Sequence, residues 1–407
     1  MKNGTSNFQQ ALWLGIGQFC TFAIAFLTAP ILARYFDKVE YGTYKQILYI
    51  YTTLQTLFTV GLPSAFSYFI PKLNSGQQKQ LVNELTIVLF LIGAVFAVAL
   101  FFLSGMIAKI LNNPELASGL RIFAVFPLFT LPAMGVEGIY TALRRTKEVA
   151  VYNIVSKVLM TLCIVLPVVI WHTGYKAAII GWGVASFLTF LIAMYMKNKP
   201  YRKVSSENIS YLYKSIVNYV LPLSGAFIAG FFLNFADQFY ISHYYGTEVF
   251  AEAFNGYFSI PIIAMVAGSV KGVLLPLFSK ADFKGELKNT MASYENAVKK
   301  TATIVLPILL FCMYFSEEIM TALFGEQYAV SASYFRLYIL RDFFEIIPYY
   351  SVLMAFGFSK FYMNLHVGGI LFTWGLDLLI VTFTNCPTLI TLTSSLFQIS
   401  CRVFSIY

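Results

Sequence analysis

Ionisable side chains interrupt several long apolar runs of this 407-residue sequence. Asp237, Lys157 and Lys271 each stand inside such a run. A charge in the hydrocarbon of a membrane costs roughly 2.5–3.5 kcal/mol on insertion scales, so such residues normally face a water-filled cavity or a partner. Long side chains near the end of a span have an alternative, because their charged tips can reach the headgroups. The chemistry to expect at these positions is the binding of ions or of charged groups.

Asp237 stands about a turn and a half before the outer end of an apolar run that stops near residue 243. Its carboxylate is a candidate proton or sodium site, or a gate residue that pairs with Arg34 at the end of the first run. The competing interpretation is a structural anchor for the turn at the outer end of the span. The sequence favours neither interpretation over the other.

A second group of charges lies in the run at 334–356. Arg341 and Glu345 are spaced i,i+4, which would place them on one face of an α-helix, and Asp342 lies beside them. The simplest interpretation is a neutralised structural ion pair, and an acid left over after pairing would be able to exchange a proton. Further charges inside apolar runs, each better suited to a structural than a catalytic role, are Arg336, Glu137 and Asp377.

The elements that carry these residues are membrane spans. Hydrophobic residues make up 58% of the chain and charged residues 12%, about half the charged fraction of a typical soluble domain. Such runs must be helical, because hydrocarbon offers no other partner to the backbone. We expect an all-α integral membrane protein with about twelve transmembrane helices of roughly 20 residues each. The predicted spans are 11–33, 45–70, 85–105, 119–142, 149–171, 177–196, 215–243, 255–278, 301–323, 334–356, 361–383 and, more weakly, 388–404.

Lysine and arginine in the connecting loops predict the orientation of this multi-pass chain. Sixteen of them, Lys197 included, are assigned to the loops after even-numbered spans, and five to the loops after odd-numbered spans. The even loops and the N-terminus are therefore expected in the cytoplasm. The formal charge of +9 then reflects topology and contact with anionic lipid headgroups, not nucleic acid. The residues assigned to the odd loops are Arg34, Lys38, Lys45, Lys109 and Lys176.

The loops leave little room for an active site. The longest polar stretches, Lys197–Lys214 and Ser279–Lys300, lie on the expected cytoplasmic side, and the outer loops are shorter still. A membrane glycosyltransferase or polysaccharide polymerase needs a larger outer loop. The sequence also has no GxxxxGK[ST] loop, HExxH motif or nucleophile triad. We expect no enzyme, no catalytic residue, no cofactor and no metal site, so any driving energy must come from an ion gradient.

A weak internal repeat divides the chain. Ala142–Lys147 (ALRRTK) resembles Ala355–Lys360 (AFGFSK), a period of about 210 residues or six spans. Because six is even, both halves start on the same side of the membrane, and the repeats are parallel. We expect two bundles, a six-helix bundle in residues 1–200 and one of five to six helices in residues 201–407, around a central cleft.

Three stretches at span ends carry a family resemblance: Ile31–Phe36 with Glu40–Tyr44, Gly61–Pro63 with Tyr68–Pro71, and Ala236–Ile241 with Asn255–Tyr257. In order and spacing they resemble the polysaccharide transporters of the superfamily that also contains the MATE-type exporters, and most closely the Wzx-type flippases of bacterial O-antigen and capsule repeat units. One departure is the Thr-, Ser- and Cys-rich end of the chain, where Arg402 is the only charge. A truncated or altered end would produce this pattern.

The resemblance implies a MATE-like flippase for O-antigen (lipopolysaccharide) or capsule synthesis. The resemblance implies that such a protein translocates a polyprenyl-pyrophosphate-linked oligosaccharide across the bacterial cytoplasmic (inner) membrane by alternating access coupled to an ion gradient. The implied partners are a lipid-linked oligosaccharide of the undecaprenyl pyrophosphate type, membrane lipids and the polysaccharide polymerase machinery. A pyrophosphate needs cations inside the cleft, and the candidates are Arg34, Lys157 and Lys271. The alternative is that each of the three snorkels separately to the headgroups.

Three other functions compete with this one. A MATE-type drug or metabolite exporter on the same fold would favour acids in its cleft, because its substrates are commonly cationic. A membrane polysaccharide polymerase or ligase would need catalytic groups in the outer loops. A nonfunctional, truncated transporter would account for the unusual end of the chain. A fold alone does not select among substrates.

Overall fold

The computed structural model describes residues 7–59, 61–260, 262–263, 265–266, 270, 287–347 and 359–404. The chain forms two compact units, residues 1–231 and 232–407, and passes from one to the other within helix α10 (Tyr213–Gly256). In the described ranges the regular structure is helical and contains no strand. The all-α prediction is therefore confirmed for this part of the chain.

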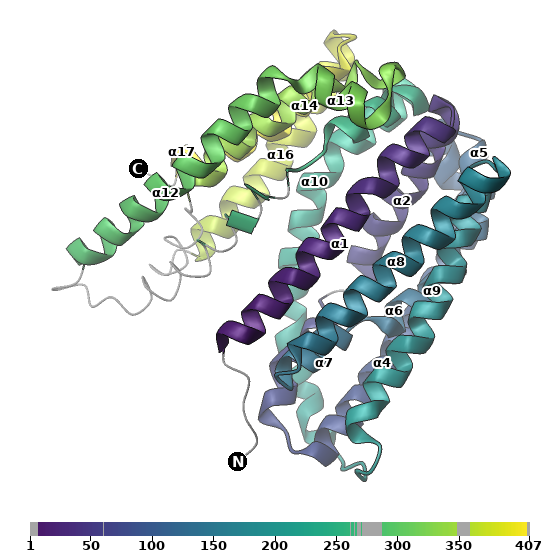
Figure 1. The fold of residues 1–407 in the computed structure, drawn as a ribbon, viewed down its shortest axis with the longest axis vertical. Helices are drawn as coiled ribbons and strands as arrows, with labels where there is room; N and C mark the ends of the chain where they lie inside the picture. Colours follow the sequence, from purple (N-terminus) through teal and green to yellow (C-terminus); the bar gives the residue numbers. More distant parts are fainter. Residues whose placement is uncertain are drawn as a thin grey trace. The chain divides into compact units, whose positions relative to one another are not determined.

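The first unit is built around five long helices, with shorter helices between them (Figure 1). The long helices are α1 (Asn7–Tyr35), α2 (Lys38–Thr59), α4 (Ser75–Ile110), α8 (Thr146–Trp171) and α9 (Tyr175–Asn198). The short helices are α3 (Ser64–Phe69), η1 (Ile70–Lys72), α5 (Glu115–Phe123), α6 (Pro127–Ala133), α7 (Val136–Ala142), η2 (Lys199–Tyr201) and η3 (Ser210–Leu212).

The second unit holds the end of α10 and the helices that follow it. They are α12 (Leu287–Tyr314), α13 (Ser316–Phe324), η4 (Glu326–Tyr328), α14 (Ser331–Leu340), η5 (Arg341–Ile346), α16 (Ser359–Phe383) and α17 (Pro387–Phe404). Within α10 the backbone of Gly246 is not helical, with a φ of 82°. The helix therefore continues past the predicted end of span seven only by changing direction there.

Helices α1 and α8 lie side by side and run parallel (Figure 1). The hydroxyls of Thr28 and Thr161 are 2.9 Å apart. Seven residues further along α1, the ring of Tyr35 stacks on His172 just beyond the end of α8, with 5.9 Å between centroids. This register fixes the relative heights of side chains on the two helices.

Two predicted spans, 45–70 and 119–142, are broken in the structure, so the prediction of continuous helices there is wrong. The first break follows α2, where Gly61 adopts a φ of 70° and Pro63 caps α3. The second lies between α6 and α7, where Gly135 adopts a φ of 92°. Glycine adopts a left-handed φ readily because it has no Cβ, so it can end a helix. A hydropathy average measures polarity and not backbone conformation, and it therefore does not detect these breaks.

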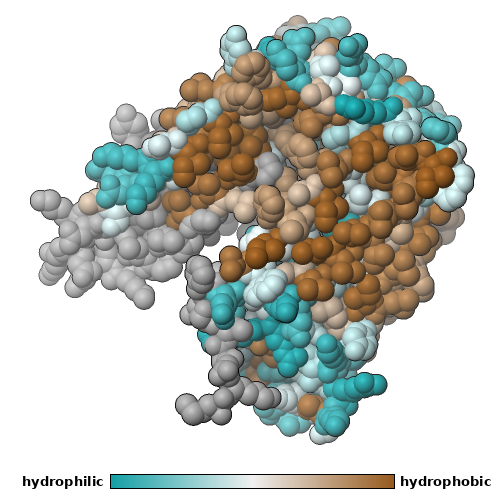
Figure 2. All heavy atoms as spheres, in the orientation of Figure 1, coloured by the Kyte–Doolittle hydropathy of each residue, from teal (hydrophilic) through white to brown (hydrophobic). Residues whose placement is uncertain are grey.

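Six helices in the described residues are long and apolar enough to cross a membrane, or seven if Glu115–Phe123 and Pro127–Ala142, which are bent by 48° relative to each other, form one span. Figure 2 shows apolar side chains along the flank of the first unit and hydrophilic ones gathered at its ends, as expected for a protein that spans a bilayer. The count of about twelve spans and the arrangement as two repeats stay predictions, because the predicted span 255–278 lies mostly outside the described residues.

Close packing of α8 against α9 depends on Gly181. A Cβ at this position would meet the carbonyl oxygen of Cys163, which is fixed backbone of α8. By contrast, a Cβ on Gly105 of α4 would meet nothing within 4 Å. Glycine therefore sets the distance between the two helices.

We expect Gly181→Ala to lower the free energy of unfolding by about 1–3 kcal/mol, because α9 must move away from α8. Thermal unfolding of the purified protein in detergent measures the change. Gly105→Ala is the matched control and should leave stability unchanged or slightly raised, because alanine favours the helix. Equal stability of the two variants would contradict the close contact.

Candidate functional site

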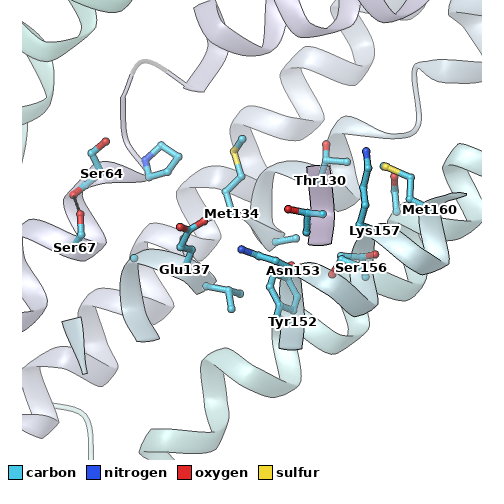
Figure 3. Close-up of a pocket in the computed structure, with 18 residues that line it drawn as sticks. Ser64, Ser67, Thr130, Met134, Glu137, Tyr152, Asn153, Ser156, Lys157 and Met160 are labelled. Carbon is cyan, nitrogen blue, oxygen red and sulfur yellow. Dashed lines mark hydrogen bonds between the residues drawn. The ribbon is translucent and has the colours of Figure 1, made fainter. Parts of the chain in front are cut away.

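A cavity of about 630 Å³ lies inside the first unit; we call it the Lys157 cavity. Its wall is formed by α1, α3, α6, α7, α8 and α9. Figure 3 shows the polar side chains that gather around it from these helices. The ones that matter for binding are Ser64, Ser67, Thr130, Glu137, Asn153, Ser156 and Lys157.

Both helix breaks of this unit reach the wall of the Lys157 cavity. Pro63 comes from the first break, and Met134 and Gly135 come from the second. Backbone outside a helix leaves amide and carbonyl groups unbonded, which the membrane interior tolerates only where they are buried in protein or line a water-filled cavity. The breaks and the polar side chains therefore indicate a hydrated cavity.

Lys157 lies on α8 about 16 Å from the start of the helix. Asn153 and Ser156 precede it by four residues and one residue, and all three line the cavity. Asn153 shares a helical face with Lys157 because four residues complete about one turn. The carbon stem of the lysine can thus place its ammonium among groups that donate and accept hydrogen bonds.

Lys45 was assigned to an outer loop, and this assignment is wrong. It lies in the second turn of α2 with only 7% of its surface exposed. Its ammonium is 5.0 Å from the ring centre of Tyr41, one turn earlier, and it is within electrostatic reach of Lys157. Two like charges that repel each other in a low-dielectric interior are both stabilised by an anion between them. The signal in the sequence is the Tyr41–Lys45 spacing of one helical turn.

The other predicted cations do not join Lys157 in this cavity. Arg34 is exposed in the last turn of α1 and does not line it. The Thr28–Thr161 contact puts Arg34 roughly 15 Å from Lys157 along the helix direction. Lys271 lies outside the described residues.

In the second unit, Asp237 and Asp377 converge. Asp237 is on α10 and Asp377 on α16, and they are 6% and 0% exposed. Trp374 clamps the two helices, since its indole N–H donates to the Phe232 carbonyl (3.0 Å) and its own carbonyl accepts from the Tyr240 hydroxyl (3.1 Å).

The two carboxylates interact electrostatically, and the hydroxyl of Thr393 on α17 donates a hydrogen bond to Asp377. The phenol of Tyr257 lies 3.2 Å from the Thr391 hydroxyl and interacts with both acids. Two carboxylates that interact in an apolar interior repel each other, so a proton or a metal cation bound between them is stabilising. The sequence marks Asp237 as a candidate site but gives no sign that Asp377 is its partner, because 140 residues separate them in the chain.

The charges near residue 341 are arranged differently from the prediction. Arg341–Ile346 is a 3₁₀-helix, with three residues per turn, so Arg341 and Glu345 stand about 120° apart around its axis instead of on one face. Arg341 instead pairs with Asp342, its Nε 3.3 Å from a carboxylate oxygen. The guanidinium also lies 3.7 Å from the ring centre of Tyr338. This arrangement fits a structural ion pair.

Lys197 was assigned to a cytoplasmic loop, but it is in the last turn of α9 and 2% exposed. Its Nζ donates to the Pro132 carbonyl of α6 (2.7 Å) and to the Thr86 hydroxyl of α4 (3.1 Å). The ring centre of Phe66 on α3 is 4.8 Å away. One buried ammonium therefore joins four helices, and nothing in its local sequence predicts this.

Comparison with known proteins identifies a family. The family described as "Polysaccharide biosynthesis protein" matches residues 8–282. The succinoglycan biosynthesis transport protein ExoT of Rhizobium meliloti (strain 1021) is 25% identical over 329 residues, 78% of this chain and 62% of ExoT. The lipopolysaccharide biosynthesis protein WzxC of Escherichia coli (strain K12) is 23% identical over 78% of this chain and 63% of WzxC. The chain thus spans less than two thirds of both relatives.

Solved structures share the fold. The lipid II flippase MurJ in an inward closed conformation superposes with a TM-score of 0.76 at 14% identity, over 97% of this chain and 87% of MurJ. An inward-facing multidrug resistance MATE family transporter of the MOP superfamily gives 0.67 at 13% identity, over 100% of this chain and 95% of the transporter. At these identities the likeness concerns the architecture alone.

We expect Lys197→Met to lower the free energy of unfolding by about 1–3 kcal/mol, because the buried Pro132 carbonyl and Thr86 hydroxyl lose their donor. Lys199→Met, two residues further on and exposed, is the matched control and should change stability little. Thermal unfolding of both variants in the same detergent measures the two changes in stability. A control variant that loses as much as Lys197→Met would argue against the buried ammonium as the cause.

Proposed function

This chain belongs to the family of polysaccharide biosynthesis proteins, and from that premise we propose that it flips a polyprenyl-pyrophosphate-linked oligosaccharide for surface polysaccharide synthesis. The names of its relatives, a succinoglycan transport protein and a lipopolysaccharide biosynthesis protein, support this substrate class. The proposed location is the bacterial cytoplasmic membrane, with the N-terminus in the cytoplasm. The lipid tail stays in the bilayer while the headgroup passes through the protein by alternating access.

The observation that carries the proposal is the pair of lysines in the first unit. Lys157 lines a polar cavity and Lys45 lies within its electrostatic reach. A pyrophosphate bears the opposite charge and accepts charge-assisted hydrogen bonds from ammonium groups. A cationic drug would be repelled from the same place, so the two lysines favour an anionic headgroup over the substrates of a drug exporter.

The remaining polar groups of the Lys157 cavity suit a sugar. Ser64, Ser67, Thr130 and Asn153 offer hydroxyl and amide groups that donate and accept. Sugar hydroxyls need partners of this kind when they leave water. The volume of about 630 Å³ accommodates the pyrophosphate with part of the oligosaccharide.

We assign energy coupling to Asp237 and Asp377 in the second unit. A proton or a sodium ion that binds between the carboxylates removes their repulsion, and its release restores it. Such a change in charge gives two states whose balance an ion gradient can shift. Contact of Asp237 with Arg34 as a gate, and anion binding by Lys271, stay predictions.

Deletion of the gene in its host tests the proposal directly. We expect polyprenyl-linked oligosaccharide to accumulate on the cytoplasmic leaflet and surface polysaccharide to be lost, with drug susceptibility unchanged. Leaflet location is measured with a membrane-impermeant reagent that modifies the sugar. Normal surface polysaccharide together with raised drug susceptibility would replace the flippase with a drug exporter.

We expect Lys157→Gln and Lys45→Gln each to reduce flipping by roughly tenfold or more, because each removes a charged hydrogen-bond donor to the pyrophosphate. Reconstituted vesicles and the same impermeant reagent measure the rate. The exposed Lys109→Gln is the control and should flip at the wild-type rate. Wild-type rates in both lysine variants would overturn the assignment of headgroup binding to Lys157 and Lys45.

We expect Asp377→Asn to abolish the acceleration of flipping by an imposed ion gradient, because the neutral amide no longer attracts a cation. Asp237→Asn should behave alike, whereas Glu248→Gln, an exposed change on the same helix as Asp237, should keep the response. Proton and sodium gradients, imposed separately on vesicles, identify the ion. Persistence of the response in both aspartate variants would exclude this pair from coupling.

A further inference from the structure

A second cavity, about 700 Å³ in volume, lies in the first unit at the end where α8 begins; we call it the Arg145 cavity. It is lined by α1, the turn between α7 and α8, the first part of α8, and the end of α9 with η2. Among the lining residues in the described part of the chain, only Tyr152 also lines the Lys157 cavity. The proposed substrate path does not account for this second space.

The polar part of the Arg145 cavity is strongly basic. Arg144, Arg145, Lys147 and Lys199 line it together with a single carboxylate, Glu148, which leaves an excess of three positive charges. Both arginines, Lys147 and Lys199 are exposed. An excess of this size within one cavity favours an anionic occupant.

The start of α8 adds to this positive potential. Its first turn carries the positive end of the helix dipole and N–H groups with no partner inside the helix. Acidic residues stabilise the start of a helix, yet Arg145 occupies the N-cap position of α8 and Lys147 lies in its first turn. Glu148 offsets only part of this repulsion, so an anion at the helix start would stabilise the arrangement.

The remaining wall is apolar and faces outward. Val151 and Val155 of α8 and Tyr195 of α9 line the Arg145 cavity and are 51%, 40% and 62% exposed. Both helices are long and apolar enough to cross the membrane, so these exposed side chains offer an apolar surface on which acyl chains can pack. Trp13 lies on the other side, its ring centre 5.4 Å from the Lys147 ammonium, and tryptophan is enriched at the level of the headgroups.

We infer that the Arg145 cavity binds an anionic phospholipid, with its phosphate among Arg145, Lys147 and Lys199 and its acyl chains along Val151 and Val155. A basic pocket at the end of membrane helices, beside an apolar wall, matches the two halves of such a lipid. A free phosphate would use only the polar half. The inference is independent of the proposed function, because it concerns a resident lipid and not the transported one.

The test compares two triple variants with the same change in charge. Arg145→Gln/Lys147→Gln/Lys199→Gln removes the basic wall, whereas Lys38→Gln/Lys109→Gln/Lys176→Gln removes three charges at the opposite end of the unit. Thermal unfolding of the full chain in detergent is measured while phosphatidylglycerol or phosphatidylcholine is titrated, and native mass spectrometry counts the retained lipid. Inorganic pyrophosphate is titrated in a separate arm.

We expect phosphatidylglycerol, and not phosphatidylcholine, to stabilise the wild type and the opposite-end variant, and its apparent affinity to fall roughly tenfold or more in the basic-wall variant. Equal affinity in all three proteins would overturn the inference. Stabilisation by inorganic pyrophosphate that is lost in the basic-wall variant would also overturn it, because the Arg145 cavity would then bind free phosphate. If the triple variant does not fold, Arg145→Gln must lose affinity and Arg145→Lys must retain it.

Discussion

Inside a membrane every backbone amide must find a hydrogen-bond partner, and this constraint decides where a helix of the first unit can be interrupted. The interruptions near Gly61 and Gly135 both lead to the wall of the Lys157 cavity. The two broken segments also pack on each other, since a Cβ on Gly135 would meet the ring of Phe66 on α3. At these turns the N–H groups of Leu62, Ser64 and Met134 donate to carbonyls of Thr59, Gly61 and Leu131. Both breaks therefore contribute to the wall of the Lys157 cavity while these amides stay hydrogen-bonded.

Charged side chains inside a membrane likewise need partners, and three groups of them in this structure differ in the partners they have. The buried ammonium of Lys197 donates hydrogen bonds to a backbone carbonyl and to a threonine hydroxyl, and it thereby connects neighbouring helices. Lys157 and Lys45 carry like charges that interact across the first unit. Asp237 and Asp377 form the corresponding arrangement for a cation. The first unit thus holds the two interacting lysines, and the second unit holds the two interacting aspartates.

A fold shared with MurJ and with MATE transporters describes how helices are arranged and leaves the cargo open. The cargo depends on which charges the arrangement brings to its cavities. Here a lysine pair stands in the first unit of a chain that belongs to the family of polysaccharide biosynthesis proteins. The Arg145 cavity, which borders the Lys157 cavity only through Tyr152, has a composition suited to a lipid that stays in place.

The sequence alone determined the helical membrane class and placed α1, α8, α9 and α16 close to their observed bounds. Long apolar runs are sufficient for this, because hydrocarbon leaves the backbone no alternative to the helix. It also selected Lys157 and Asp237, since a charge inside a span is costly enough to stand out.

Only the tertiary structure decided which charges meet. It brought Asp377 to Asp237 and placed Lys45 near Lys157, and it left Arg34 exposed at the end of α1. The physical reason is that the partner of a buried charge is set by helix register and packing across more than a hundred residues of chain. A pattern within one span holds no information about that register, and a hydropathy average smooths over the glycines that break the helices.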